Sequence, residues 1–172
     1  FNPQHLYSVN NGIAFDNDIP PCNRKEFFTR FNVPFPEDCI LVGIMARLHP
    51  VKDHDTFLRA AAEVAKVNPE ARFLIAGPGE ELMPGLKQLA NKLGIASKVF
   101  FTGNVENPYD FFQIIDINVL SSVSEGFPYV VLEGARFSKP FISTRVGGLG
   151  DLVQSGFNGY LVEPKDWKAL GE

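Results

Sequence analysis

Residues 40–67 have the sequence ILVGIMARLHPVKDHDTFLRAAAEVAKV, which predicts a strand, a loop and a helix in that order. The run at 40–45 is apolar throughout and contains β-branched residues, which is typical of a strand buried on both faces. The segment 54–67 carries apolar residues on one helical face, namely Phe57, Leu58, Ala61, Val64 and Ala65. A buried strand followed by an amphipathic helix is the repeating unit of parallel α/β sheets.

The remainder of the chain continues this alternation. Further apolar strands are predicted at 72–77, 98–102, 117–122, 140–144 and 159–163. Helices are predicted between them at 82–93, 108–115, 128–137 and, more briefly, 149–155. Pro128 is expected at the first helical position, where its missing N–H costs nothing. We therefore expect an α/β fold: a doubly wound parallel sheet of about six strands with helices on both faces.

The first part of the chain has a different character. Residues 1–39 are rich in Asn, Asp and Pro and are interpreted as a lead-in or linker, with a short helix around 25–31. Residues 40–172 are interpreted as the folded domain. The chain begins at Phe1 rather than Met and stops within DWKALGE (166–172), which resembles the opening of a helix. We expect a piece of a longer protein.

Composition excludes several classes of protein. Sixteen Lys and Arg against twenty Asp and Glu give a formal charge of −4, so a nucleic-acid partner is not expected. Two cysteines, Cys22 and Cys39, are too few for a disulfide scaffold or a four-ligand zinc site. His49 and His54 lack metal-ligand spacing, and no apolar run is long enough to span a bilayer. A cytoplasmic location without a metal or cofactor is expected.

A doubly wound sheet binds its ligand at the carboxyl ends of its strands. The loops expected there are 46–53, 77–80, 103–107, 122–128 and 145–150. In the first of them, Arg47 and Lys52 could hold a phosphate or diphosphate; the alternative is two solvated loop charges. The glycines in GPGE (77–80) and VGGLGD (146–151) favour either ligand approach or simple turns. None of these loops contains the dinucleotide fingerprint G-x-G-x-x-G.

The loop and helix SEGFPYVVLE (124–133) carry the most information. Gly126 allows the backbone to approach a ligand, and the helix that begins near Pro128 directs its free N–H groups at the same place. Glu125 precedes this helix. Glu133 lies inside it, in apolar company, where a carboxylate needs water or a hydroxyl partner. The alternative is an exposed stripe of Tyr129, Glu133 and Arg136 with an i, i+3 ion pair.

Four blocks in order resemble a known family. They are NNGIAFDND (10–18), ARLHPVKDHDTFLRAAA (46–62), SEGFPYVVLEGARFSKPFISTRVGG (124–148) and SGFNGYLVEPKD (155–166). The chain resembles the C-terminal, donor-binding domain of the group 1 family of retaining glycosyltransferases, which is one half of a GT-B fold. The pair Glu125 and Glu133, with seven residues between them, is the most specific feature of this resemblance.

The resemblance implies roles for individual residues. Arg47 and Lys52 would hold the donor diphosphate, and together with Glu125, which would face the transferred sugar, they are the candidate catalytic residues. Glu133 would bind the ribose hydroxyls. Two segments complete the implied donor site: the backbone of Gly126, Phe127 and Pro128 along the sugar and phosphates, and Thr102 to Val105 at the nucleotide base.

The sequence departs from the family pattern at several positions. Ala46 and Asp53 stand where the family usually has Gly, and Asp151 replaces the usual Glu after the double glycine. The sequence GAR (134–136) also replaces the common residues after Glu133. The candidate phosphate cations and both glutamates are retained, so these departures bear on the identity of the sugar.

The expected function is the nucleotide-sugar-binding half of a retaining glycosyltransferase that acts on an unidentified acceptor, without a metal. The acceptor domain is expected in a missing N-terminal part of the same protein, and any membrane association would arise there. This chain alone is expected to bind donor without transferring sugar. Two alternatives stay open: a non-catalytic nucleotide-binding module of the same fold, and a nucleotide-sugar epimerase.

Overall fold

The computed structural model describes residues 11–14 and 18–172. Residues 1–10 and 15–17, which hold His5, much of the predicted lead-in and part of the block 10–18, lie outside the described residues. The centre of the fold is one sheet of six strands: β1 (Ile40–Met45), β2 (Ala71–Ala76), β3 (Val99–Gly103), β4 (Ile117–Leu120), β5 (Phe141–Thr144) and β6 (Gly159–Val162). All neighbouring strands pair in parallel.

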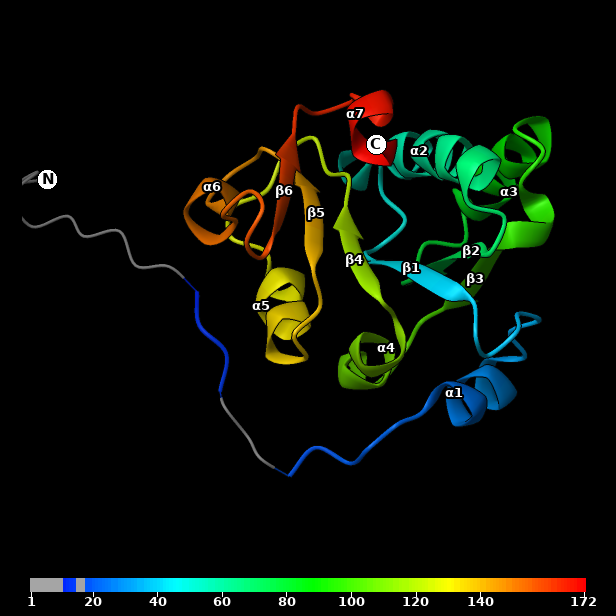
Figure 1. Cartoon of the computed structure of the whole chain (residues 1–172), viewed down its shortest axis with the longest axis horizontal. Coiled ribbons are helices and arrows are strands. Elements are labelled where there is room, and N and C mark those ends of the chain that lie inside the picture. Colours follow the sequence, from blue (N-terminus) through cyan, green and yellow to red (C-terminus); the bar gives the residue numbers. More distant parts are fainter. Residues whose placement is uncertain (1–10, 15–17) are drawn as a thin grey trace, which may run out of the picture.

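The strand order is β3-β2-β1-β4-β5-β6 (Figure 1). Chain order therefore reverses direction at β1 and β4, which are neighbours in the sheet although two strands separate them in the chain. This is the order of doubly wound nucleotide-binding sheets, and the crevice between the carboxyl ends of β1 and β4 is the switch point at which such sheets bind ligands. The predicted fold class is confirmed.

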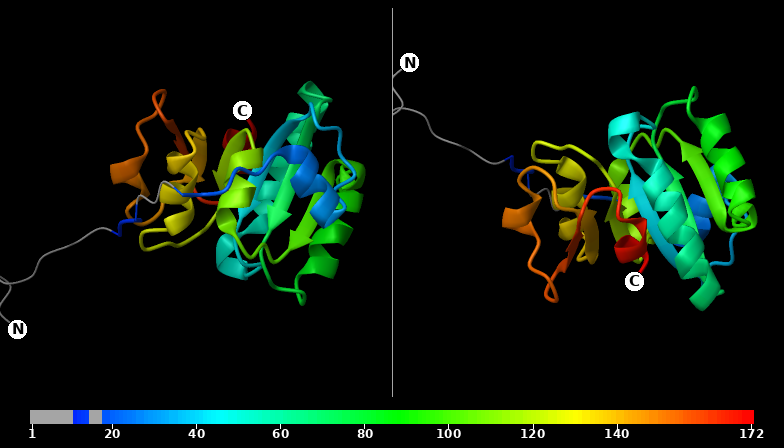
Figure 2. Two further views of the ribbon diagram at one scale, coloured as in Figure 1. Left: turned by 90° about the horizontal axis from the view of Figure 1, so that it is seen from below. Right: turned by 90° about the horizontal axis from the view of Figure 1, so that it is seen from above.

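Helices cover both faces of the sheet. They are α1 (Arg24–Phe31), α2 (His54–Val67), α3 (Met83–Lys92), α4 (Pro108–Ile114), α5 (Tyr129–Arg136), α6 (Leu149–Leu152) and α7 (Trp167–Gly171), with 3-10 turns η2 (Pro50–Lys52) and η3 (Ala96–Lys98). Figure 2 shows α1, α4 and α5 on one face and α2, α3 and α7 on the other. Each strand of the sheet centre is thus sandwiched, which is why the strands are apolar at successive positions.

One large apolar cluster lies on each face of the sheet. Ile44 and Phe73 pack with Phe57 and Leu58 of α2, whereas Leu41 and Leu74 pack with the phenylalanines of α1 and α4. Within β1, a Cβ on Gly43 would lie 2.6 Å from both Phe111 and Ile115, so glycine is what allows α4 to approach the strand this closely.

The second half of the predicted lead-in is packed on the sheet. The helix predicted around 25–31 is α1, which Asn23 and Glu26 begin with a capping box. Phe27 and Phe28 are buried in the cluster with α4. The guanidinium group of Arg24 holds α1 against the domain by donating hydrogen bonds to the carbonyl oxygens of Ile114 and Cys39, at 2.8 and 2.7 Å. Residues 24–39 are therefore part of the folded unit rather than a free linker.

Candidate functional site

The loops predicted to carry the ligand site do follow the carboxyl ends of the strands. An open cleft of about 770 Å³ lies beyond β1, β2 and β3. Residues from three loops line it: Arg47, Leu48, His49, Pro50, Gly77, Pro78, Gly79, Glu80, Glu81, Leu82, Met83, Gly103 and Asn104. Within the described part of the chain, no ion-pair partner reaches Arg47, which is exposed. A cation without a counter-ion in a concave site is suited to an anionic ligand.

Lys52 and Glu125 meet at the switch point. The Nζ atom of Lys52 lies 2.5 Å from Oε1 of Glu125, and the exposed fractions of the two side chains are 26% and 9%. Ser122 donates its hydroxyl to the same carboxylate oxygen, also at 2.5 Å. The loop after β1 and the loop after β4 are thus joined through charged side chains that the sequence placed at the ligand site but did not place in contact.

Backbone contacts fix the relative position of these two loops. The hydroxyl of Ser121 donates to the carbonyl oxygens of Lys52 and Asp53, both at 2.9 Å. The amide of Val123 donates to the carbonyl oxygen of Val51 at 2.8 Å. The sequence interpretation missed Ser121 and Ser122, because it extended the strand to 122 while β4 ends at Leu120. Two adjacent serines after an apolar run were the available signal.

Asp53 illustrates how a departure from the family pattern is accommodated. Its backbone is left-handed, with φ of 47° and ψ of 54°, a conformation that glycine adopts freely and Asp tolerates. Its carboxylate caps α2 by accepting from the amide and the hydroxyl of Thr56, at 3.4 and 2.8 Å. The turn that carries Lys52 is therefore preserved without glycine.

The start of α5 supplies unpaired backbone donors. Pro128 is the N-cap residue, not the first helical residue as predicted, and α5 begins at Tyr129. In the part of the chain that the structure describes, no side-chain hydrogen bond caps this helix. The first amide groups of a helix have no partner within it, and the helix dipole adds positive potential at the same end. This supports the predicted anion site near Phe127 and Pro128.

The two glycines after β5 lie against the loop that carries Glu125. The amide of Gly148 donates to the carbonyl oxygen of Gly126 at 2.8 Å. A Cβ on Gly148 would lie 2.5 Å from the ring of Phe127. The loop 146–151 therefore supports the loop 125–128 through its backbone.

Glu133 lies one turn into α5 and is half-buried. Burial raises the pKa of its carboxyl group above the ordinary value. Among the described residues no hydrogen bond or ion pair to this carboxylate is found. Arg136, the partner in the exposed-stripe interpretation, instead donates to the carbonyl oxygen of Ala14 at 2.8 Å and lies over the ring of Tyr109. The i, i+3 ion pair of the exposed-stripe interpretation is therefore not formed between Glu133 and Arg136.

The segment predicted to contact the base is only partly at the cleft. Thr102 donates its hydroxyl to the carbonyl oxygen of Gly103 at 3.0 Å, and Val105 is buried in the cluster beneath α4. Their side chains do not line the cleft, whereas Gly103 and Asn104 do. Val105 lies two residues beyond the end of β3, in a loop that carries its side chain into the core.

A contact that the sequence interpretation missed joins the lead-in to this site. The side-chain amide of Asn11 donates to the carbonyl oxygen of Phe127 at 2.7 Å. With the bond from Arg136 to Ala14, it places residues 11–14 alongside α5. The block NNGIAFDND held the available signal, because Asn11 belongs to it.

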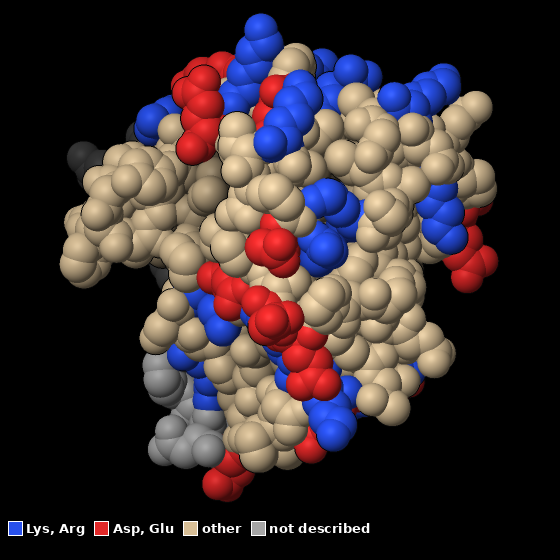
Figure 3. All heavy atoms as spheres, turned by 45° about the vertical axis from the view of Figure 1, so that its right-hand side comes forward, with Lys and Arg blue, Asp and Glu red and all other residues tan. Residues whose placement is uncertain are grey.

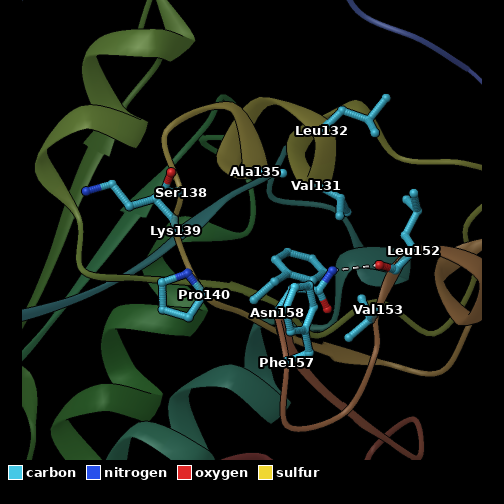
Figure 4. Close-up of a pocket in the computed structure, with 11 residues that line it drawn as sticks. Val131, Leu132, Ala135, Ser138, Lys139, Pro140, Leu152, Val153, Phe157 and Asn158 are labelled. Carbon is cyan, nitrogen blue, oxygen red and sulfur yellow. Dashed lines mark hydrogen bonds between the residues drawn. The ribbon is translucent and has the colours of Figure 1, made fainter.

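A second cavity lies away from these residues. An apolar groove of about 500 Å³ is lined by α5, the segment 152–158 and the amino end of β5. Figure 4 shows the labelled residues of α5 and of the segment 152–158 around it, with Pro140 beside them. Asn158 donates to the carbonyl oxygen of Leu152 at its edge, at 2.8 Å. Because ligand sites of doubly wound sheets lie at the carboxyl ends, this groove is not part of the candidate site.

Within residues 11–14 and 18–172, no group of three or more His, Cys, Asp or Glu could hold a metal ion. None of the helices in these ranges has the length and apolarity needed to cross a membrane. On the face in Figure 3, acidic side chains form a band while basic side chains are scattered around them.

Several curated proteins resemble this chain in sequence. D-inositol 3-phosphate glycosyltransferase 2 of Catenulispora acidiphila is 34% identical over 175 residues, covering 96% of this chain and 40% of that protein. The putative glycosyltransferase EpsD of Bacillus subtilis is 32% identical over 136 residues, covering 79% of this chain and 35% of EpsD. The chain thus spans about 40% of the length of such relatives.

Solved structures share the fold. Anabaena Alr3699/HepE in complex with UDP aligns with a TM-score of 0.75 at 24% identity, covering 86% of this chain and 40% of that one. A glycosyltransferase from Rickettsia africae aligns with a TM-score of 0.77 at 22% identity, covering 86% and 39%. The family model for glycosyl transferases group 1 matches residues 25–172, which include α1 and every strand of the sheet. The chain belongs to the group 1 glycosyl transferase family.

Proposed function

We propose that this chain is the nucleotide-sugar-binding half of a retaining glycosyltransferase. The observation that carries the proposal is the gathering of Arg47, Lys52, Glu125 and the uncapped start of α5 around the carboxyl ends of the strands. These groups are two cations, one carboxylate and a set of backbone donors. They suit a ligand that combines a diphosphate with a polyhydroxylated sugar.

The chemistry follows from charge development. Breaking the bond between the sugar and the diphosphate leaves negative charge on the leaving phosphate, and preorganised donors lower the barrier where that charge appears. Arg47, Lys52 and the amides of α5 would provide this stabilisation without a metal ion. In a retaining reaction the acceptor attacks from the side of the leaving group, assisted by a phosphate oxygen, as the family resemblance implies.

The remaining roles are proposed from position and from relatives. The Glu133 carboxylate, which has no hydrogen-bond or ion-pair partner among the described residues, would accept hydrogen bonds from ribose hydroxyls. Glu125 would face the transferred sugar. Gly103 and Asn104, which line the cleft, would contact the nucleotide base. Anabaena Alr3699/HepE, which shares this fold, has been solved in complex with UDP and in complex with UDP-glucose, which makes these two molecules the first probes to use.

An acceptor-binding half is proposed on another part of the protein, because relatives are more than twice as long as this chain. Transfer takes place where the acceptor is oriented against the donor, and orientation is worth about 7–11 kcal/mol of barrier. The chain alone should therefore bind donor without turnover, whereas a non-catalytic module would show no transfer even within the full-length protein. The family match favours a transferase over the epimerase alternative.

The test is calorimetric titration of the chain with UDP, ADP, GDP and UDP-glucose, in the presence and absence of a chelator. Arg47→Ala should weaken binding of the preferred diphosphate by roughly tenfold or more, because a charge-assisted hydrogen bond contributes about 1.5–3 kcal/mol. Arg59→Ala removes an equal charge from an ion pair with Asp55 on α2 and should bind as the parent does. Equal binding by Arg47→Ala and the parent, or a strict requirement for Mg²⁺, would overturn the proposed site.

A further inference from the structure

The two cations of the proposed diphosphate site, Arg47 and Lys52, differ in whether they form an ion pair. Arg47 faces the cleft without an ion-pair partner among residues 11–14 and 18–172, whereas Lys52 is paired with Glu125. Both hydrogen bonds to Glu125, from Lys52 and from Ser122, go to Oε1. A diphosphate that engages Lys52 must therefore share it with a carboxylate that is already in place.

The carboxylate is the more firmly held partner of this pair. Ser122, whose side chain is fully buried, fixes Glu125 through its hydroxyl. Ser122 is itself held, because Thr144 of β5 donates its hydroxyl to the Ser122 carbonyl oxygen at 2.5 Å. Lys52 instead has a long, flexible side chain with three donor hydrogens and can turn toward another anion.

We propose that Glu125, positioned by Ser122, competes with the nucleotide's diphosphate for Lys52 and thereby weakens binding of the nucleoside diphosphate product more than binding of the donor. This inference rests on the proposed function. With donor bound, hydroxyls of the sugar hydrogen-bond to Glu125 and offset the loss of its ion pair. After transfer the sugar has left, and a poorly solvated carboxylate keeps its hydrogen bond from Ser122 but has no counter-ion while Lys52 serves the diphosphate.

The Glu125 carboxylate then regains its ion pair with Lys52. A buried charge that loses its counter-ion is costly, so the state in which Lys52 serves the diphosphate alone is disfavoured once the sugar is gone. The product is released more readily as a result. Since product release limits the turnover of many enzymes, Glu125 would act on the release step as well as on sugar orientation.

The experiment compares three ligands on matched variants. The ligands are the nucleoside diphosphate that the parent chain binds most tightly, its glucose conjugate, and the corresponding nucleoside without phosphates. Glu125→Gln keeps the shape of the side chain and removes its charge. It should bind the diphosphate roughly three- to tenfold more tightly than the parent, as expected for release of a partly exposed ion pair. Its affinity for the nucleoside should be unchanged.

Two further variants test the positioning role of Ser122. Ser122→Ala should also raise diphosphate affinity, by less than Glu125→Gln, and should reduce the advantage of the glucose conjugate over the diphosphate. Ser122→Thr restores the hydroxyl and should restore the parent ratio. Ser143→Ala removes an equally buried hydroxyl from β5 that donates to the Thr144 carbonyl oxygen, and should leave all three affinities unchanged. Circular dichroism establishes which variants are folded.

The outcomes separate this inference from the proposed function. Tighter diphosphate binding by Glu125→Gln that disappears when Lys52→Ala is added supports the competition. Weaker or equal diphosphate binding by folded Glu125→Gln overturns it while leaving the proposed function standing. If the parent binds none of the nucleoside diphosphates, the proposed function fails and the competition fails with it.

Discussion

A Cβ on Gly147 would lie 2.3 Å from the carbonyl oxygen of Glu125, so the loops after β5 and β4 are in direct backbone contact beside the candidate catalytic carboxylate. The same Cβ would meet the carbonyl oxygen of Gly126 at 2.3 Å, and Gly147 has a positive φ of 54°. Glycine is therefore required here by both space and conformation. The position of the Glu125 backbone therefore depends on the absence of a side chain at Gly147.

Gly147→Ala should displace the loop 125–127 and destabilise the fold by about 1–3 kcal/mol, because it combines a clash with backbone strain. Nucleoside diphosphate affinity should fall in the same variant. Gly150→Ala is the matched control, since a Cβ at Gly150 meets nothing within 4 Å. Urea unfolding and calorimetric titration measure the two effects. Parent-like affinity in Gly147→Ala would mean that this loop does not shape the site.

Gly126→Ala separates folding from ligand approach. A Cβ at Gly126 has no neighbour within 4 Å and its φ is not in the left-handed region, so stability should stay within about 0.5 kcal/mol of the parent. Affinity for the glucose conjugate should nevertheless fall severalfold if the backbone lies along the sugar and phosphates. Thermal unfolding measures the stability of the variant, and calorimetric titration of the same sample measures its affinity for the glucose conjugate. Unchanged affinity would remove Gly126 from the proposed donor site.

Glu133→Gln should raise the unfolding temperature of the ligand-free chain at neutral pH. The pKa of Glu133 is raised by burial, so the folded state carries an unfavourable charge above that pKa, and the stability gained from Gln should shrink as the pH falls toward it. Glu106→Gln, at an exposed glutamate, should show neither effect.

The same variant tests the ribose role. Removing a ribose hydroxyl from the diphosphate ligand should weaken its binding to the parent but change its binding to Glu133→Gln little. Equal losses in both proteins would argue against contact between Glu133 and the ribose.

Stability should also fall as the pH drops from 7 toward 4, through His54. Burial, with a smaller contribution from Lys52, lowers the pKa of His54 to about 4 from 6.5. Between pH 6.5 and about 4, His54 is protonated in the unfolded chain but neutral in the folded chain. This difference lowers the free energy of unfolding by up to about 3 kcal/mol. Urea unfolding of the parent and of His54→Leu at pH 7 and pH 5 measures this contribution. The same slope in both proteins would assign the loss to other groups; His49→Asn, at an exposed histidine, should behave as the parent.

The sequence alone determined the fold class and most elements. A run such as ILVGIM, which is apolar at successive positions, must be buried on both faces and therefore lies between two layers of helices. The amphipathic segment 54–67 supplies a helix for one of these layers. The sequence also singles out Arg47, Lys52, Glu125 and Glu133 as candidates for the site, because the family motifs lie in order along the chain. The packed helix α1 was underestimated, since eight residues give too short a periodic pattern to reveal buried phenylalanines.

Tertiary structure alone decided which of these residues meet. Lys52 and Glu125 are 73 positions apart, and their contact exists because β1 and β4 are neighbours in the sheet. Strand order depends on how helices pack over both faces, which is a property of the whole core rather than of any local pattern. The same holds for Ser121 and Ser122, whose hydroxyls bond to groups on other loops. Local periodicity specifies what each segment is, whereas long-range packing specifies which side chains share a site.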